Sequence, residues 1–288
     1  MFEGVIPALV TPFRDDFSVD YEGIARNLDY LEKYVDAVVP AGTTGEAATL
    51  SYEEHVEVVR YVVETSKVPV IGGAGSNSTR EAIWLTKKVE EVGADAAMLV
   101  TPYYNKPNQR GLYEHYRAVA SEVSIPIIIY NVPSRTGVSV TAETVAKLAE
   151  IDNIVGIKEA SGNLKLVSEI VRLTGDDFVV LSGDDFLTLP IMALGGRGVI
   201  SVAANVAPHL IKEMVSAFRS GNIEKAREIH MKLAPLFEAL FIDTNPIPVK
   251  KALELMGLAA GKPRLPLVEL SEDKTEKLKA VLKNLGLI

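Results

Sequence analysis

Short apolar runs and longer stretches with helical spacing alternate along the chain. The apolar runs are typical of buried strands, because a strand covered on both faces shows little polar alternation. The stretches between them place apolar residues three or four positions apart, which is typical of helices with one buried face. The eight strand-like runs are Gly4–Val10, Ala37–Pro40, Val68–Gly72, Ala96–Val100, Pro126–Tyr130, Ile154–Lys158, Phe178–Leu181 and Gly198–Val202.

The helical stretches fall between most of these runs. At one of them, Ser51 and Glu54 have the spacing of a capping box, in which a hydroxyl and a carboxylate satisfy free N–H groups at a helix start. Strands that alternate with helices of this length indicate βαβ units and a parallel sheet. The expected helices are Tyr21–Leu31, the stretch beginning at Ser51, Thr79–Val92, Gly111–Val123, Thr141–Ala149, Asn163–Thr174 and Asp185–Leu194.

Eight repeats of this unit predict an α/β protein with a closed (β/α)8 TIM barrel. The rival is an open doubly wound sheet, which usually has a glycine-rich phosphate turn after its first strand. Here the first strand ends in Val10-Thr11-Pro12-Phe13, which contains no glycine. We therefore expect a catalytic barrel over residues 1–223.

After about residue 207 the chain shows no further strand-like run. One of the later helices must close the barrel, and the others are surplus to it. We expect these to form a small all-helical domain over residues 224–288. The helices expected in this part are Ile211–Ser220, Asn222–Phe241, Pro248–Leu255 and Ser271–Leu285.

Composition narrows the classes of function. The net charge of −8 argues against a general nucleic-acid binder, because no excess of Lys and Arg is available to neutralise phosphates. The absence of cysteine excludes disulfides, thiol nucleophiles and Cys-ligated zinc. No apolar run approaches the roughly 18 residues of a membrane span, and the first residues lack the basic segment of a signal peptide. We expect a cytoplasmic protein.

The lysine that ends the run Ile154–Ile157 has two interpretations. If the strand ends at Ile157, Lys158 is the first solvated residue. If Lys158 instead points into an apolar interior, burial disfavours its charged form. A neutral amine is the nucleophile that forms Schiff bases with carbonyl substrates.

The polar segments after the strands should converge, because the carboxyl ends of barrel strands form the active face. Hydroxyls, one lysine and one arginine predominate there, which suits an anionic substrate with a carbonyl group. The four histidines fall in helical patterns, so no imidazole is expected to hold a metal at this face. Asp184-Asp185 could bind Mg²⁺ through oxygen, but carboxylates are also typical of a solvated helix start.

Each of the other candidate segments is ambiguous when taken alone. The segment 42–46, Gly-Thr-Thr-Gly-Glu, is either a tight turn or a loop whose N–H groups and hydroxyls bind a carboxylate. The pair Tyr103-Tyr104 and the strand-end Tyr130 are typical of packing, although a phenol beside a buried amine can act as a general acid/base. Arg135 is either simply exposed or a bidentate carboxylate ligand.

Taken together and in order, these segments resemble the dihydrodipicolinate synthase family over the whole chain. This family lies within the pyruvate-dependent class I aldolases, the superfamily of N-acetylneuraminate lyase. The segments carrying Lys158 and Arg135 are the most specific. The matching segments are 42–46, 101–105, 130–137, 156–160, 182–185, 198–201 and 245–250.

The resemblance implies that pyruvate forms an imine with Lys158, becomes an enamine and attacks the aldehyde of L-aspartate 4-semialdehyde. The product would be 4-hydroxy-tetrahydrodipicolinate, in the committed step of lysine and diaminopimelate biosynthesis. Tyr130 would act as general acid/base, in a relay with Thr43 and with Tyr104 of the partner subunit. Arg135 would hold the carboxylate of the semialdehyde.

The resemblance also implies how the pocket and the assembly are built. Thr44 would bind the pyruvate carboxylate through its hydroxyl and N–H, and the backbones of Gly183 and Ile200 would shape the pocket. No cofactor or metal is implied. A homo-oligomer is implied, usually a tetramer built as a dimer of dimers, because Tyr104 acts across subunits. Neither nucleic acid nor a membrane is an expected partner.

Some members of the family bind lysine at a second site and are inhibited by it. Ala47 departs from the serine common in inhibited members, and Tyr52 replaces a histidine. Both outcomes therefore stay open, and His55 and Glu81 are alternatively two exposed helix residues. The positions that match this possible allosteric site are Ala47, Ala48, Tyr52, His55, Asn77, Glu81 and Tyr103.

Two other functions compete with this interpretation. A sugar-acid lyase of the same superfamily, such as N-acetylneuraminate lyase or a 2-keto-3-deoxy sugar-acid aldolase, would share Lys158 and Tyr130. Such relatives generally lack an arginine at the position of Arg135, which favours the synthase. The second competitor is a catalytically inactive barrel that serves as a sensor or scaffold, against which the intact candidate residues argue.

Overall fold

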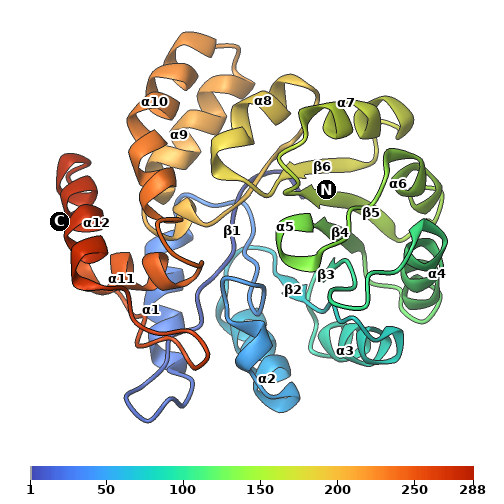
Figure 1. Cartoon of the computed structure of the whole chain (residues 1–288), viewed down its shortest axis with the longest axis horizontal. Helices are drawn as coiled ribbons and strands as arrows, with labels where there is room; N and C mark the ends of the chain where they lie inside the picture. Colours follow the sequence, from blue (N-terminus) through green and yellow to red (C-terminus); the bar gives the residue numbers. More distant parts are fainter. Residues whose placement is uncertain (1) are drawn as a thin grey trace.

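Seven parallel strands form one sheet in the computed structural model, which describes residues 2–288. Their order is β1-β7-β6-β5-β4-β3-β2, and helices surround the sheet on its outer side (Figure 1). The strands are β1 (Gly4–Pro7), β2 (Ile71–Gly73), β3 (Ala96–Val100), β4 (Ile127–Asn131), β5 (Ile154–Glu159), β6 (Val179–Ser182) and β7 (Gly198–Ser201).

The segment expected as the second strand, Ala37–Pro40, closes the ring between β1 and β2. It forms isolated parallel bridges, Val39 with Ala8 on one side and Val38 with Val70 on the other. The N–H of Val39 donates to Pro7 O at 2.9 Å, and Val38 O accepts from the N–H of Ile71 at 2.9 Å. Prolines have no N–H, so Pro40 leaves a gap in the hydrogen-bond ladder. The segment thus completes the predicted eight-stranded barrel without forming a regular strand.

The helices around the barrel follow the predicted pattern with one correction. The expected helix Asp185–Leu194 is divided into a 3₁₀ turn, η2 (Asp185–Leu187), and α8 (Thr188–Ala193). The capping box is present, because Ser51 accepts from Glu54 N while the Glu54 carboxylate accepts from Ser51 N. The remaining helices of this part are α1 (Tyr21–Leu31), α2 (Tyr52–Thr65), α3 (Thr79–Glu91), α4 (Gln109–Ala120), α5 (Pro133–Thr136), α6 (Ala142–Leu148), α7 (Leu164–Leu173) and α9 (Pro208–Arg219), with 3₁₀ turns η1 (Ala47–Thr49) and η3 (Ala203–Asn205).

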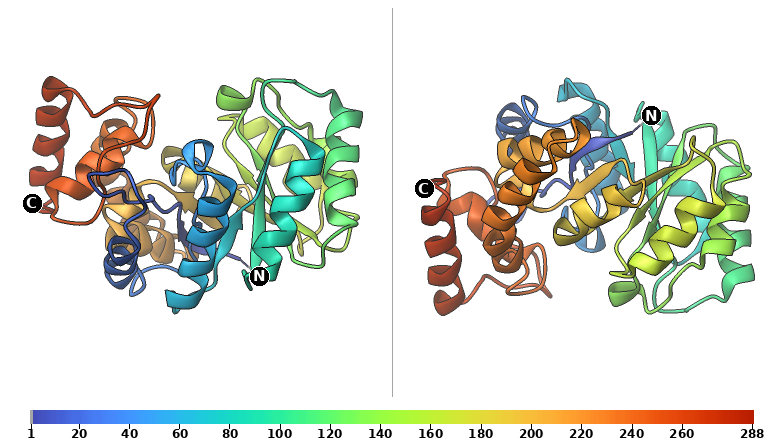
Figure 2. Two further views of the ribbon diagram at one scale, coloured as in Figure 1. Left: turned by 90° about the horizontal axis from the view of Figure 1, so that it is seen from below. Right: turned by 90° about the horizontal axis from the view of Figure 1, so that it is seen from above.

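Three further helices follow α9, as expected. They are α10 (Ile223–Ala239), α11 (Ile247–Leu255) and α12 (Glu272–Asn284). They gather on one side of the barrel (Figure 2), where α10 packs on α9 and α12 packs on both α10 and α11. Because their apolar residues belong to the same hydrophobic cluster as the outer face of the sheet, the boundary of a separate domain at residue 224 stays a prediction.

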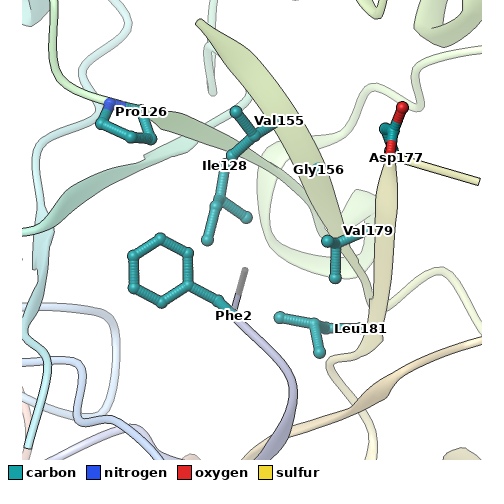
Figure 3. A pocket seen from close by; sticks show the side chains of 8 residues that line it. All are labelled: Phe2, Pro126, Ile128, Val155, Gly156, Asp177, Val179 and Leu181. Carbon is teal, nitrogen blue, oxygen red and sulfur yellow. The ribbon is translucent and has the colours of Figure 1, made fainter.

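The barrel interior is a second apolar cluster, separate from the one between sheet and helices. Side chains of a strand alternate between the two faces, and the hydrophobic ones that face inward are mostly small or aliphatic, with Tyr130 as the aromatic member. At the amino end of the strands, Phe2 lies across a pocket of about 220 Å³ from Ile128 and Leu181 (Figure 3). The members of the interior cluster are Ile6, Ala8, Ala37, Val39, Ile71, Ala96, Met98, Ile128, Tyr130, Val132, Val179, Leu181 and Ile200.

None of the helices within residues 2–288 is both long and apolar enough to cross a membrane.

Candidate active site

Lys158 points into the barrel, and the strand register explains why. Ile128 pairs with Gly156 and Tyr130 pairs with Lys158 across β4 and β5. Because Ile128 and Tyr130 face the interior, their neighbours in the register face it too. The side chain is buried, with the residue 5% exposed, and its Nζ lies 4.1 Å from the centre of the Tyr130 ring. The interpretation of Lys158 as a solvated strand end is therefore wrong.

Gly183 makes room for the lysine side chain. A Cβ at this position would lie 3.0 Å from Lys158 Cε and 2.7 Å from Ala160 Cβ, and both distances are shorter than ordinary contacts. Ile200, on β7, is 1% exposed and belongs to the interior cluster with Tyr130. Gly183 therefore lies beside the Lys158 side chain, and Ile200 lies in the barrel interior rather than on the surface.

The loop 42–46 carries the predicted pair of threonines. The residue before the loop, Ala41 with φ 50, and its last residue, Glu46 with φ 55, both lie in the left-handed region. This conformation costs free energy in a non-glycine residue and must be held by its surroundings. Thr43 lines the main cavity. Thr44 is buried, and its Oγ1 accepts a hydrogen bond of 3.0 Å from Asn245 Nδ2.

A buried ion pair holds this loop against the C-terminal helices. Lys250 Nζ lies 2.6 Å from Glu46 Oε1, with the two side chains 2% and 1% exposed. Glu46 Oε2 also accepts from Arg264 N at 2.9 Å, and Lys250 Nζ donates to Thr11 O at 3.2 Å. Burial lowers the pKa of Lys250, while the Glu46 carboxylate opposes that shift.

The sequence analysis missed this pair, although both residues lie in segments that carried the family resemblance. The available signal was that one of these segments contains a glutamate and the other a lysine, which have opposite charges. Their 204-residue separation gave no indication that they meet.

A cavity of about 520 Å³ opens at the carboxyl end of the barrel and brings several predicted residues together. Thr43, Tyr130 and Arg135 line it. Arg135, on the short helix α5, is exposed, and its Nη2 donates to the backbone oxygen of Asn245 at 3.1 Å. From the C-terminal part of the chain the lining includes Thr244, Asn245, Pro246, Pro266 and Leu267. The cavity thus combines a hydroxyl, a phenol and a guanidinium. One of its lining residues, Tyr130, contacts the buried Lys158.

The same cavity reaches most of the positions predicted for a second site. His55 is not an exposed helix residue, because it is 6% exposed and its Nε2 donates to Gly73 O at 2.6 Å. Burial lowers the pKa of His55. Glu81 is exposed, as that alternative expected, and accepts from Ser76 Oγ at 2.8 Å. Asn77 is absent from the cavity lining, which includes Ala47, Ala48, Tyr52, His55, Glu81 and Tyr103.

Tyr104 is predicted to form a relay with Thr43 and Tyr130, but within a single chain it does not lie with them in the cavity. It is 89% exposed, outside the lining of the cavity. Its φ of 71 places a bulky residue in the left-handed region, where such residues are uncommon. A single chain therefore places Thr43 and Tyr130 in the cavity but leaves Tyr104 in solvent.

Asp185 is not part of a solvated helix start, which corrects that expectation. It is 3% exposed, and its carboxylate accepts from Ser201 Oγ at 2.5 Å, Val202 N at 3.1 Å and Ala203 N at 3.0 Å. Burial raises its pKa, and these three donors oppose the rise. Asp184 caps η2 by accepting from Phe186 N. The carboxylate of Asp185 thus fixes the turn that follows β7 and does not face the cavity.

The chain is similar to known proteins along its whole length. A model described as the dihydrodipicolinate synthetase family matches residues 1–285. The chain is 80% identical to 4-hydroxy-tetrahydrodipicolinate synthase from Archaeoglobus fulgidus, covering 100% of both chains. A solved dihydrodipicolinate synthase from Aquifex aeolicus is 51% identical with a TM-score of 0.97 over 99% of both chains. A structure of the enzyme from Cyanidioschyzon merolae with lysine bound is 46% identical with a TM-score of 0.97, covering 100% of this chain and 99% of that one.

Proposed function

The chain belongs to the dihydrodipicolinate synthetase family, and from this membership we propose how its residues carry out the reaction. The protein is a lyase that condenses pyruvate with L-aspartate 4-semialdehyde to give 4-hydroxy-tetrahydrodipicolinate, in the biosynthesis of lysine and diaminopimelate. The observation that carries the residue assignment is the buried amine of Lys158 beside the ring of Tyr130.

The first half of the reaction forms a nucleophilic carbon. The Lys158 amine adds to the carbonyl carbon of pyruvate, and loss of water leaves a protonated imine. This imine is an electron sink, so the methyl group of pyruvate can lose a proton to give an enamine. Tyr130 is the proposed general acid/base for these transfers, since its phenol side chain is next to the amine and can both donate and accept a proton.

The second half joins the two substrates and releases the enzyme. The enamine carbon attacks the aldehyde carbon of the semialdehyde, and the resulting alkoxide takes up a proton. The α-amino nitrogen of the adduct then attacks the imine carbon, which closes the ring and frees the Lys158 amine. One water molecule leaves overall, and no oxidant or reductant is consumed.

The substrate carboxylates are assigned to two different groups. Thr44 is proposed to donate its hydroxyl and N–H to the pyruvate carboxylate. Arg135 is proposed to bind the semialdehyde carboxylate at the cavity entrance, where its exposed guanidinium lies and where its planar fork suits a carboxylate. Neutral hydroxyls move protons in this site without a fixed negative charge that would repel two anionic substrates.

Assembly into at least a dimer is part of the proposal. Tyr104 completes the relay with Thr43 and Tyr130 only if it enters the site of a neighbouring copy, because in its own chain it extends into solvent. A tetramer built as a dimer of dimers is the proposed assembly.

The arm of the cavity around His55 and Glu81 is proposed as a site for lysine. The Glu81 carboxylate would accept from an ammonium group, and Tyr52 and Tyr103 add phenol groups to the same cavity. Calorimetric titration with lysine tests this assignment. Saturable binding that Glu81→Gln weakens supports it, and the absence of saturable binding to the native protein contradicts it.

Turnover with defined substrates tests the proposed function. Pyruvate plus L-aspartate 4-semialdehyde should be consumed, whereas N-acetylneuraminate and 2-keto-3-deoxy sugar acids should not. Turnover of only the sugar acids would reject the synthase, and turnover of neither class would favour an inactive scaffold. Arg135→Ala should raise the KM for the semialdehyde at least tenfold while pyruvate binding changes little; an equal loss for both substrates would show that Arg135 is structural.

A further inference from the structure

Asn245 contacts both residues that are proposed to bind substrate carboxylates, Thr44 and Arg135. One of its polar atoms has no hydrogen-bond partner among the described residues. The residue is 5% exposed and lines the main cavity. Its Nδ2 donates to Thr44 Oγ1 at 3.0 Å, and its backbone oxygen accepts from Arg135 Nη2 at 3.1 Å. Within residues 2–288, its Oδ1 is a buried side-chain oxygen with no hydrogen-bond partner.

A buried acceptor without a partner destabilises the folded protein, and native structures contain few such atoms. Two other such atoms occur in the part of the chain that the structure describes, one in His115 and one in His230. Neither histidine lines the cavity. Within residues 2–288, Asn245 Oδ1 is therefore the member of this group that belongs to a residue lining the cavity.

The proposed role of Thr44 fixes the orientation of the Asn245 amide. If the Thr44 hydroxyl donates to the pyruvate carboxylate, its oxygen must accept from Asn245, which requires the NH₂ group on that side. A reversed amide would take the hydroxyl proton and turn the lone pairs of Thr44 toward the carboxylate, which is repulsive. The oxygen of the amide is thus left free to accept a hydrogen bond from a ligand.

We infer that Asn245 Oδ1 accepts a hydrogen bond from the α-ammonium group of the semialdehyde and selects α-amino acids over acids without that group. The inference rests on the proposed function. In the semialdehyde, the ammonium and the carboxylate are attached to the same carbon. A carboxylate on Arg135 therefore brings the ammonium close to Asn245, because Arg135 already contacts the backbone of that residue.

A neutral acceptor suits this position better than a carboxylate would. An amide oxygen accepts from an ammonium without adding a fixed negative charge beside Thr44, where the pyruvate carboxylate is proposed to bind. It also leaves the Arg135 guanidinium available to the substrate, whereas an aspartate side chain would compete for it.

The test compares the semialdehyde with 4-oxobutanoate, which has the same chain, aldehyde and carboxylate but no amino group. In Asn245→Leu the KM for the semialdehyde should rise at least tenfold, while the inhibition constant of 4-oxobutanoate changes less than twofold. Arg135→Ala is the matched control and should weaken both compounds similarly, since both have the carboxylate. If Asn245→Leu weakens both compounds equally, the residue only positions Thr44 and Arg135, and the inference is overturned.

A second variant covers the case in which Asn245→Leu does not fold. Asn245→Asp keeps an acceptor oxygen. Its preference for the semialdehyde, measured as the inhibition constant of 4-oxobutanoate divided by the KM for the semialdehyde, should be at least a third of the native value. Loss of the preference in this variant would also overturn the inference. Failure of the proposed function is distinguishable, because the native protein would then not consume the semialdehyde at all.

Discussion

Gly183 shows how one absent side chain shapes the site around Lys158. In Gly183→Ala the new methyl group would lie 2.7 Å from Ala160 Cβ and 3.0 Å from Lys158 Cε. Overpacking of this kind costs about 1–3 kcal/mol, and displacement of the lysine should slow imine formation at least tenfold. The rate at which borohydride traps the pyruvate adduct measures the effect on imine formation, and the midpoint of thermal unfolding measures the effect on stability.

A matched control for Gly183→Ala is present in the same chain. A Cβ at Gly175 would meet no atom within 4 Å, so Gly175→Ala should leave the trapping rate and the unfolding midpoint near the native values. If Gly183→Ala traps pyruvate as fast as Gly175→Ala, the space beside Lys158 is not limiting.

Site residues could be predicted from the sequence where the evidence lay in the residues next to them in the same strand. Lys158 was a candidate because an apolar run ends at it, and the register with Tyr130 follows from the parallel sheet. The role of Asn245 could not be predicted in this way, because its contacts with Thr44 and Arg135 span 201 and 110 residues. A family resemblance placed Asn245 in a matching segment but gave no indication of its unpaired oxygen.

At the scale of elements, the packing of α4 on α3 makes the stability of the fold depend on pH. His115, on α4, is 4% exposed and its Nδ1 lies 2.9 Å from Thr79 Oγ1 at the start of α3. Burial lowers the pKa of His115 from its usual 6.5 to about 4. Between these pH values the unfolded chain binds a proton that the folded chain does not, so acidification favours unfolding.

The expected loss from this histidine is up to about 3 kcal/mol between pH 7 and pH 4. Urea unfolding at both pH values, compared between the native protein and His115→Gln, isolates its contribution from that of the carboxylates. The variant should lose less stability on acidification than the native protein does. The same loss in both proteins would show that folding does not lower the pKa of His115.

Helices and strands could be predicted from the sequence where the spacing of apolar residues stayed regular along the whole segment. Helices with one apolar stripe, such as α2 with its capping box, need no tertiary information. The segment 37–40 and the divided helix 185–194 were less predictable for physical reasons. A proline interrupts the ladder of the first, and the second bends because buried Asp185 accepts from the turn after β7.

At the scale of the whole molecule, the buried pair Glu46–Lys250 connects the first third of the chain to its C-terminal helices. Lys250→Met would leave the Glu46 carboxylate buried without its charged partner and should destabilise the protein by about 3–5 kcal/mol. The double variant Glu46→Gln with Lys250→Met should recover most of that loss, because no buried charge remains. Guanidinium chloride unfolding of the two variants and the native protein gives both values.

An exposed lysine serves as the control for this pair. Lys165 and Glu169 lie 4.0 Å apart with side chains 84% and 41% exposed, and exposed pairs contribute about 0–1 kcal/mol. Lys165→Met should therefore change stability by less than about 1 kcal/mol. If Lys250→Met costs no more than Lys165→Met, the buried pair does not hold the loop 42–46 in place.

The proposed assembly predicts that inactive variants restore each other. Lys158→Met lacks the amine and Tyr104→Phe lacks the relay hydroxyl, so each alone should be nearly inactive. In a mixed dimer one site combines the native Lys158 of one copy with the native Tyr104 of the other. Equal mixing with free exchange should therefore restore about a quarter of the native sites. Activity that stays at the mean of the two variants would show that Tyr104 acts within its own chain or not at all.

The proposed mechanism requires that the amine of Lys158 forms the covalent bond to pyruvate. Two lysines of the described chain are buried, Lys158 at 5% and Lys250 at 2% exposure, but Lys250 is paired with Glu46. Reduction with borohydride in the presence of pyruvate, followed by peptide mass mapping, separates them. We expect one adduct, on Lys158, that Lys158→Met abolishes. An adduct on Lys250, or none on Lys158, would contradict the proposed mechanism.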